Sequence, residues 1–398
     1  MEKAALQHIF NNIDRLTPEY VRLWKEFGGI ETRSDKIDAL GRLADRIQEY
    51  AQTHGFSVIR EHYEGAGDPL VLVLPEKRGE DGAPVLGEFS RQEGPVSLLG
   101  HFDTVHETGA FGEPPVTERD GKLFGPGMYD MKGGVVSALF TCEALRLSAL
   151  PHREIKIILD PDEESGEHLG EHRKEFHLRH VRGSIAAINC ESGLEGIITV
   201  GRKGVLRVGI DISGVSAHAG NSYFKGSSAV REAAHKILAL ESGSREGGLT
   251  FNVGKVQGGT VVNIVPDKCH MEVDIRFIDQ DMFDEALKTV DRIVKNCAVP
   301  GCSAEWHILH VLDAMPETEA NHRLFELYDR TARENGLEEF SPAFRGGGSD
   351  AAFPTLLGIP TICSAGVTGH FEHTVKEEAD IASLPRRTKI LAATLLKI

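Results

Sequence analysis

Short apolar strands that alternate with helical patterns are the feature that most constrains the fold of this chain. Apolar runs at residues 69–74, 96–99, 155–159 and 185–188 predict strands. Apolar spacing predicts helices over residues 36–50 and 134–148. Apolar strands separated by helices are typical of an α/β fold, in which helices cover both faces of the sheet.

The pattern changes near Gly204. Residues 205–212 alternate between apolar and polar side chains as a half-buried antiparallel strand does. The following residues predict an α+β domain inserted into the first, with helices at 226–240 and 281–296 and strands at 250–256, 260–264 and 269–277. The α/β pattern then resumes with a helix at 317–335, a strand at 360–363 and a terminal helix. We therefore expect one domain from residues 1–203 and 313–398, and an inserted domain from residues 204–312.

The charge of the chain excludes some classes of partner. Its 398 residues include 44 Lys and Arg against 60 Asp and Glu, which gives a net charge of −16. This balance argues against nucleic acid or an anionic membrane as the main partner. No apolar run approaches the roughly 18 residues that span a bilayer, and the first residues lack the apolar core of a signal peptide. We expect a cytoplasmic protein whose six cysteines, none in a CxxC pair, are reduced thiols.

Two charged segments predict exposed structure. Residues 76–93 are rich in charge, Gly and Pro, which favours an exposed hairpin loop or an insertion. Residues 166–180 contain several histidines and predict a solvated helix or loop.

Chemically reactive side chains are concentrated in five short segments, most of which follow a predicted strand. These side chains are His101, Asp103, Asp130, Glu163, Glu164, Glu191, His370 and His373. Open α/β sheets bind ligands at the carboxyl ends of their strands, so we expect these groups to converge. Imidazole and carboxylate ligands without thiolates suit Zn²⁺, or Mn²⁺ or Co²⁺ in its place.

The adjacent acids Glu163 and Glu164 can divide two tasks. Neighbouring side chains on an extended segment point to opposite sides, so Glu164 can bind a metal while Glu163 acts as general base on a water molecule. Asp103 follows His101 by two residues and can orient its imidazole from behind.

These segments resemble the M20 family of metallopeptidases. This family of zinc hydrolases includes glutamate carboxypeptidases of the G2 type, aminoacylases, and the acetylornithine and succinyl-diaminopimelate deacylases. The resemblance implies a zinc-peptidase-like mixed sheet, with the inserted domain serving as lid and dimerisation domain. It therefore also implies a homodimer.

The resemblance further implies a role for each reactive side chain. His101 and Glu191 would bind one zinc ion of two per chain, and Glu164 and His373 the other. Asp130 would bridge the two ions and be followed by a cis peptide bond, and Glu163 would be the general base. His370 remains the alternative to His373.

The inserted domain supplies a second set of residues by resemblance. His218, in Ser216-Ala-His218-Ala-Gly220, resembles a histidine that stabilises the oxyanion in the partner subunit's active site. Asn263 and Arg276 resemble residues that hold the substrate's carboxylate, and the planar fork of Arg suits that task. The alternative for Arg276 is a surface ion pair. Lys203 and Gly347 resemble further substrate contacts, although Gly346–Gly348 can equally form a tight turn.

The family resemblance implies amide hydrolysis by metal-activated water. A Glu at position 191 implies a carboxypeptidase or a deacylase rather than an aminopeptidase. We expect a carboxypeptidase that releases a C-terminal amino acid such as glutamate from a small peptide. The alternative is a deacylase of N-acyl amino acids, similar to aminoacylase or acetylornithine deacetylase. A metal-free scaffold protein on the same fold is disfavoured because the expected metal ligands and the general base are all present.

Overall fold

The chain folds into two compact units. The computed structural model describes residues 2–79, 82, 85–148 and 150–398. Unit 1 comprises Met1–Gly201, Glu317–Phe344 and Ser349–Ile398, and unit 2 comprises Arg202–Pro316 and Arg345–Gly348. Four residues of the loop predicted at 76–93, at positions 80, 81, 83 and 84, lie outside the described residues.

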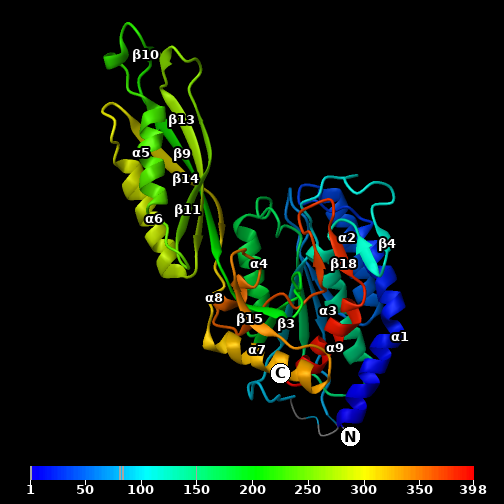
Figure 1. The fold of residues 1–398 in the computed structure, drawn as a ribbon. Coiled ribbons are helices and arrows are strands. Elements are labelled where there is room, and N and C mark those ends of the chain that lie inside the picture. The colour runs from blue at the N-terminus through cyan, green and yellow to red at the C-terminus, as the bar shows by residue number, and fades with distance from the viewer. Residues whose placement is uncertain (1, 80–81, 83–84, 149) are drawn as a thin grey trace. The chain divides into compact units, whose positions relative to one another are not determined.

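A six-stranded sheet forms the centre of unit 1, in the order β1-β2-β6-β3-β7-β16 (Figure 1). Its strands are β1 (Ser57–Arg60), β2 (Leu70–Leu74), β3 (Val96–His101), β6 (Ile155–Asp160), β7 (Ala186–Asn189) and β16 (Thr361–Ile362). Strand β3 pairs in parallel with β6 and β7, and β16 in parallel with β7, whereas β2 pairs antiparallel with β1 and β6. The sheet is therefore mixed, and the carboxyl ends of its parallel strands share one edge.

Helices cover both faces of this sheet, as the sequence predicts. The alternation of side chains along β3 sends Leu98 into a core that also contains residues of α1, α2, α3, α7 and α9. Leu99 points to the other face, where Phe176 and Val181 of α4 cover the sheet. These helices are α1 (Glu2–Gly28), α2 (Ile37–Thr53), α3 (Gly133–Arg146), α4 (Glu171–Val181), α7 (Glu319–Glu334) and α9 (Ser383–Leu395). The short helix α8 (Ala352–Leu356) packs against α4.

Helix α4 corrects the prediction for residues 166–180. The segment was expected to be solvated, but Arg173, Phe176 and His177 are buried. The many charged residues of this segment made its apolar face hard to recognise. Phe176 and Val181 pack against the sheet, and Arg173 and His177 pair with buried acids.

Short strands complete unit 1. A four-stranded sheet has the order β17-β18-β5-β4, and β8 pairs with β15. These strands are β4 (Thr117–Arg119), β5 (Lys122–Phe124), β8 (Ile197–Arg202), β15 (Ser341–Arg345), β17 (Gly369–His370) and β18 (Glu378–Asp380). The short segment η1 (Met128–Lys132), whose backbone is not helical at Asp130 and Met131, leads directly into α3.

Unit 2 has its own sheet and its own core. Its strands run antiparallel in the order β11-β13-β9-β14, and α5 and α6 pack on the apolar side chains of the sheet. A separate two-stranded sheet pairs β10 with β12. These elements are β9 (Gly204–Ser213), β10 (Ala217–His218), η2 (Tyr223–Lys225), α5 (Ala229–Glu241), β11 (Thr250–Gly258), β12 (Ile264–Val265), β13 (Lys268–Phe277), α6 (Gln280–Lys295) and β14 (Ser303–Leu312).

The strand predicted at residues 260–264 is wrong for most of its length. Only Ile264 belongs to a strand, and the backbone N–H of Ile264 donates to the carbonyl of Val261 across a turn. Val261 and Val262 are exposed, so their apolar character does not reflect a place in the core. The edge strand β14 was not predicted.

Among the described residues, no helix has both the length and the apolar character needed to cross a membrane.

Candidate active site

The residues expected to bind metal meet at one edge of the main sheet of unit 1. His101 is the last residue of β3, the pair Glu163 and Glu164 follows β6, and Glu191 follows β7. Because β3, β6 and β7 are parallel neighbours, their carboxyl ends lie together. Asp130 comes from η1 and His373 from the loop after β17.

Asp130 lies at the centre of this group. Its Oδ1 atom is 3.3 Å from Nε2 of His101, and its Oδ2 atom is 3.3 Å from Nε2 of His373. The peptide bond between Asp130 and Met131 is cis, as the resemblance implied. One carboxylate therefore faces two imidazoles through its two different oxygens.

Two further acids complete the cluster. Glu164 Oε2 lies 3.1 Å from Nε2 of His373, and Glu191 Oε1 lies 3.8 Å from Nε2 of His101. The ligand atoms of His101, Asp130 and Glu164 lie within 4.8 Å of one another, in an arrangement that could hold a metal ion. The donors are all imidazole nitrogens and carboxylate oxygens, a set that suits Zn²⁺, Mn²⁺ or Co²⁺.

The structure brings His373 to the cluster, whereas His370 lies in β17, opposite Glu378 of β18. The side chain of His373 is 54% exposed, so a ligand can reach it from solvent.

Asp103 ties the loops of the cluster together. Its Oδ1 is 3.2 Å from Nδ1 of His101 and accepts a hydrogen bond from the backbone N–H of Glu163 at 3.1 Å. Its Oδ2 accepts from the N–H of Glu164 at 3.1 Å and from the hydroxyl of Ser34 at 2.7 Å. Asp103 thus orients both the imidazole and the Glu163-Glu164 segment. The contact from Ser34 was not predicted, because nothing local in the sequence connects residues that far apart.

The electrostatics of the cluster favour bound cations. Burial would lower the pKa of His101, but hydrogen bonds to Asp103, Asp130 and Glu191 outweigh it and raise the pKa well above its ordinary value. Hydrogen bonds to Asp130 and Glu164 raise the pKa of His373 to about 11. Burial and the charge of Asp130 raise the pKa of Glu164 well above the usual range. These shifts express an excess of buried carboxylate, which a divalent cation would compensate.

Glu163 is the acid of the pair that makes no close contact with the histidines of the cluster. Burial raises the pKa of its carboxyl to about 7, against the opposing charges of His101 and Arg173. A carboxylate with a pKa near neutrality can both take and give a proton at neutral pH.

The fully buried carboxylate of Glu377 fixes the backbone that carries Asp130. Its Oε1 accepts from the N–H groups of Tyr129 at 2.8 Å and of Asp130 at 3.0 Å. Its Oε2 lies 2.6 Å from Nε2 of His106 and accepts from the N–H of Gly127 at 3.3 Å. Glu377 was not among the residues predicted for the site.

Unit 2 carries the residues expected to contact the substrate. The exposed residues His218 and Asn263 lie next to each other across the β10–β12 pairing, where the N–H of Ala219 donates to the carbonyl of Asn263 at 2.9 Å. The N–H groups of Gly220 and Asn221 both donate to Nδ1 of His218 at 3.1 Å. Since Nδ1 accepts, a neutral His218 carries its proton on Nε2.

The other predicted contact residues of unit 2 already have partners. Arg276 forms the ion pair that was its alternative assignment, because its Nε donates to Oδ1 of Asp274 at 2.6 Å. Lys203 Nζ donates to the carbonyl of Gly248 at 2.8 Å, and the carbonyl of Gly347 accepts from Arg202 at 3.2 Å.

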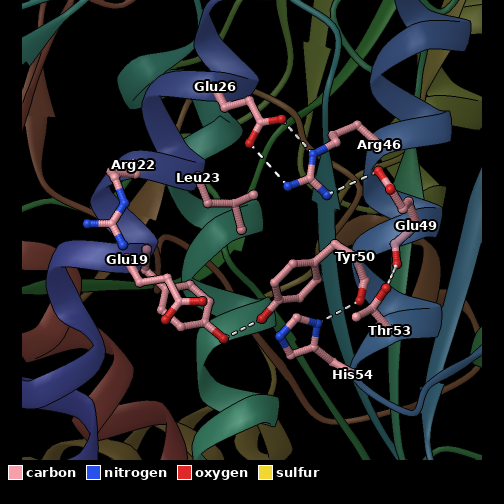
Figure 2. Close-up of a pocket in the computed structure, with 10 residues that line it drawn as sticks. Glu19, Arg22, Leu23, Glu26, Arg46, Glu49, Tyr50, Thr53 and His54 are labelled. Atoms are coloured by element: carbon pink, nitrogen blue, oxygen red, sulfur yellow. Dashed lines mark hydrogen bonds and ion pairs between the residues drawn. The ribbon is translucent and has the colours of Figure 1, made fainter.

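A separate cleft lies between α1 and α2 of unit 1 (Figure 2). Its volume is about 500 Å³, and Tyr20, Tyr50 and His54 form part of its wall. Arg46 is held there by Glu26 and Glu49. None of the predicted site residues is among the described residues that line this cleft.

Comparison with known proteins gives the family context of this site. The chain is 25% identical to carboxypeptidase G2 of Pseudomonas sp. (strain RS-16) over 390 residues, covering 96% of this chain and 89% of that protein. It is also 25% identical to succinyl-diaminopimelate desuccinylase of Corynebacterium glutamicum over 307 residues, covering 74% and 79% of the two chains. Among solved structures, aminopeptidase PepT of Bacillus cereus has the same fold, with a TM-score of 0.78, 21% identity and coverage of 96% and 98%.

The family model described as peptidase family M20/M25/M40 matches residues 97–397. This range includes all of the expected metal ligands, which are His101, Asp130, Glu164, Glu191 and His373. That range covers most of the chain. The protein therefore belongs to peptidase family M20/M25/M40 and is a hydrolytic enzyme that acts on peptide bonds.

Proposed function

We propose that this enzyme is a dinuclear metallocarboxypeptidase that releases a C-terminal amino acid, glutamate in the first instance, from a small peptide. The observation that carries this proposal is the contact of two imidazole Nε2 atoms with opposite oxygens of Asp130. A carboxylate in that position can serve two cations at once.

The proposed ligands follow from this arrangement. His101 and Glu191 would hold one zinc ion, Glu164 and His373 the other, and Asp130 both; Mn²⁺ or Co²⁺ are alternatives with the same ligand preferences. When bound, such a pair of ions polarises the scissile carbonyl and lowers the pKa of water. The excess of buried acid around His101 supports a site that needs cations.

Glu163 would act as the general base. It takes a proton from the attacking water and delivers it to the leaving nitrogen as the amide bond breaks. Its neighbour Asp103 supports this role, because it holds the backbone N–H groups of both Glu163 and Glu164. The pKa of about 7 that burial gives the Glu163 carboxyl fits a group that exchanges protons near neutral pH.

Unit 2 would bind the substrate, act as a lid and form the dimer. With Nδ1 accepting two N–H groups, a neutral His218 would donate through Nε2, which supports the proposed task of stabilising the oxyanion of the partner subunit's substrate. Arg276 and Asn263 would hold the free carboxylate of the substrate, and Lys203 and Gly347 would make further contacts with the substrate. Because Arg276 is paired with Asp274, the substrate carboxylate would share or replace that partner.

A deacylase of N-acyl amino acids is the second candidate. The similarity to a desuccinylase over 74% of the chain favours it, and the proposed metal ligands would be the same. Family membership speaks against a metal-free scaffold. A cytoplasmic location is part of the proposal, supported by six cysteines that form no disulfide among the described residues.

The test is a substrate panel with zinc-, manganese- and cobalt-loaded protein. The panel contains glutamyl-terminated peptides, pteroyl-type glutamates and N-acetyl amino acids, and the Glu163→Gln variant is the control. We expect release of a C-terminal amino acid by the parent protein and a loss of at least about 100-fold in kcat for the variant. Activity confined to N-acetyl amino acids would favour the deacylase instead.

A further inference from the structure

Next to Glu163, unit 1 holds a second group of charged side chains that the proposed mechanism does not use. Asp160 ends β6, Arg173 and His177 lie on α4, and Asp350 precedes α8. At most 4% of any of these four side chains is exposed. Charged side chains that are buried this deeply need either partners of opposite charge within the protein or a function that explains them.

The guanidinium of Arg173 connects the members of this group. Its Nε donates to Oδ2 of Asp160, and its Nη2 donates to Oδ1 of Asp350. His177 Nε2 lies 3.1 Å from Oδ2 of Asp160 and 3.6 Å from Oδ2 of Asp350. The ring of Phe353 stacks on His177 with 4.6 Å between centroids and also lies 5.4 Å from the guanidinium carbon. Arg173 is therefore anchored on several sides.

The spacing of Asp160, His177 and Asp350 alone would allow a metal ion. However, both carboxylates already accept hydrogen bonds from Arg173, so the chain provides its own cation there. A metal ion would have to displace a buried arginine. The group is better explained as a set of side chains that hold the guanidinium of Arg173 in a fixed position.

The same Nη2 atom that binds Asp350 lies 3.8 Å from Oε1 of Glu163. This distance is too long for a hydrogen bond but short enough for strong attraction between charges in a buried site. A direct two-point ion pair would occupy the oxygens of Glu163 and hinder proton transfer. Two aspartates instead hold the arginine, so its charge can attract Glu163 while the carboxylate stays free.

We propose that Arg173 is a positioning residue, which keeps the Glu163 carboxylate in the orientation that takes a proton from the attacking water. This inference rests on the proposed function, in which Glu163 is the general base. Asp160 and Asp350 contribute indirectly, because their hydrogen bonds hold Arg173 in place.

A double-mutant cycle tests the inference in the zinc-loaded full-length chain, with the glutamyl-terminated peptide that is cleaved fastest. The variants are Arg173→Met, Glu163→Gln and their combination. We expect Arg173→Met to lower kcat by about 100-fold, the cost typical of a slightly misplaced catalytic group. We expect its KM and its content of two zinc ions to match the parent, and the double variant to be no slower than Glu163→Gln alone.

Two comparisons separate positioning from a general effect on folding. Arg173→Lys keeps the charge without the fork and should recover part of the lost kcat. Arg179→Met makes the same change at an exposed arginine of α4 that pairs with Glu61, and should leave kcat unchanged. If Arg173→Met does not fold, Asp350→Asn can replace it, because this variant weakens the hydrogen bond to Arg173 at nearly constant side-chain volume. Its loss of kcat should be smaller, and should likewise vanish in the Glu163→Gln background.

Several results would overturn the inference. These are an unchanged kcat in Arg173→Met, a loss of kcat that persists undiminished in the Glu163→Gln background, and a loss that parallels loss of zinc. A third metal ion that disappears on mutation of Asp160 or His177 would do the same. Full activity of Glu163→Gln would instead refute the general base itself, and with it the task assigned to Arg173.

Discussion

At the scale of single residues, the candidate site depends on side chains that hold the backbone and the side chains of other residues in place. Glu377 is the strongest example, because one buried carboxylate accepts from the N–H groups of Gly127, Tyr129 and Asp130 and contacts His106. These contacts fix the backbone that leads into Asp130. Partners of this kind tune metal affinity although they touch no metal.

We predict that Glu377→Met weakens metal binding and kcat/KM by about 10- to 100-fold, the range found when such supporting groups are lost. Methionine fills the space but cannot accept the hydrogen bonds of the Asp130 segment. Glu377→Gln is the matched control and should lose less. The amide oxygen of the glutamine can still accept hydrogen bonds from the N–H groups of Tyr129 and Asp130. Its amide nitrogen can donate to Nε2 of His106 when the proton of that imidazole is on Nδ1. Competition with a chelator measures the affinity, and equal affinities of the methionine variant and the parent would contradict the prediction.

At the scale of elements, helix α3 brings its first turn unusually close to the loop that carries Glu191. A Cβ atom on Gly134 would lie 1.8 Å from the carbonyl oxygen of Cys190, so only glycine allows this approach. The approach sets the position of the residue directly after Cys190, which is Glu191. The start of α3 is thus part of the structure of the site.

We predict opposite effects for the same substitution at two helical glycines. Gly134→Ala should lower the free energy of unfolding by about 1–3 kcal/mol, as overpacked cores do. It should also weaken metal binding through Glu191. Gly41→Ala, in α2, should raise the free energy of unfolding by about 0.4–1 kcal/mol, because nothing lies within 4 Å of the added Cβ. Urea denaturation measures both, and a stabilised Gly134→Ala variant would refute the proposed close contact.

The contrast between predicted and observed elements has a physical cause. The strands of the main sheet other than β1 were predicted from their apolar runs, which burial on both faces of a sheet favours, as in β2 and β6. Strand β1 was not predicted, because none of its four residues is fully buried. Helix α4 was misjudged because its buried polar residues, Arg173 and His177, are paired with acids elsewhere in the chain that no local pattern reveals.

At the scale of the whole molecule, the described residues form two units with separate cores. The proposed metal ligands all belong to unit 1, together with the buried acids that repel one another without a cation. Unit 2 has its own sheet and two helices around an apolar cluster. Bound metal should therefore stabilise the units unequally.

We predict that removing metal with a chelator lowers the unfolding temperature of unit 1 and leaves that of unit 2 nearly unchanged. A ligand present at about 1,000 times its Kd contributes about 4 kcal/mol to the state that binds it. Scanning calorimetry should show one transition that moves and one that stays, and restored zinc should reverse the shift. Equal shifts of both transitions would mean that the metal acts on more than unit 1.

The sequence by itself determined the fold class and predicted the residues of the candidate site. His101, Asp130, Glu163, Glu164, Glu191 and His373 each stand in a short local motif, and the alternation of strands and helices predicts that most of them lie at one edge of a sheet. A residue that directly follows a parallel strand lies at the edge where the carboxyl ends of the strands meet. Its position can therefore be predicted from the order of the elements along the chain.

Only the tertiary structure decided which residues support that chemistry. Ser34, Arg173 and Glu377 act through contacts with Asp103, Asp350 and the Asp130 segment, which are distant in the sequence. It also placed His373 rather than His370 at Asp130, and paired Arg276 with Asp274. Hydrogen bonds and ion pairs act over a few ångströms of space, and the distance between two atoms in space is set by packing rather than by their separation along the chain.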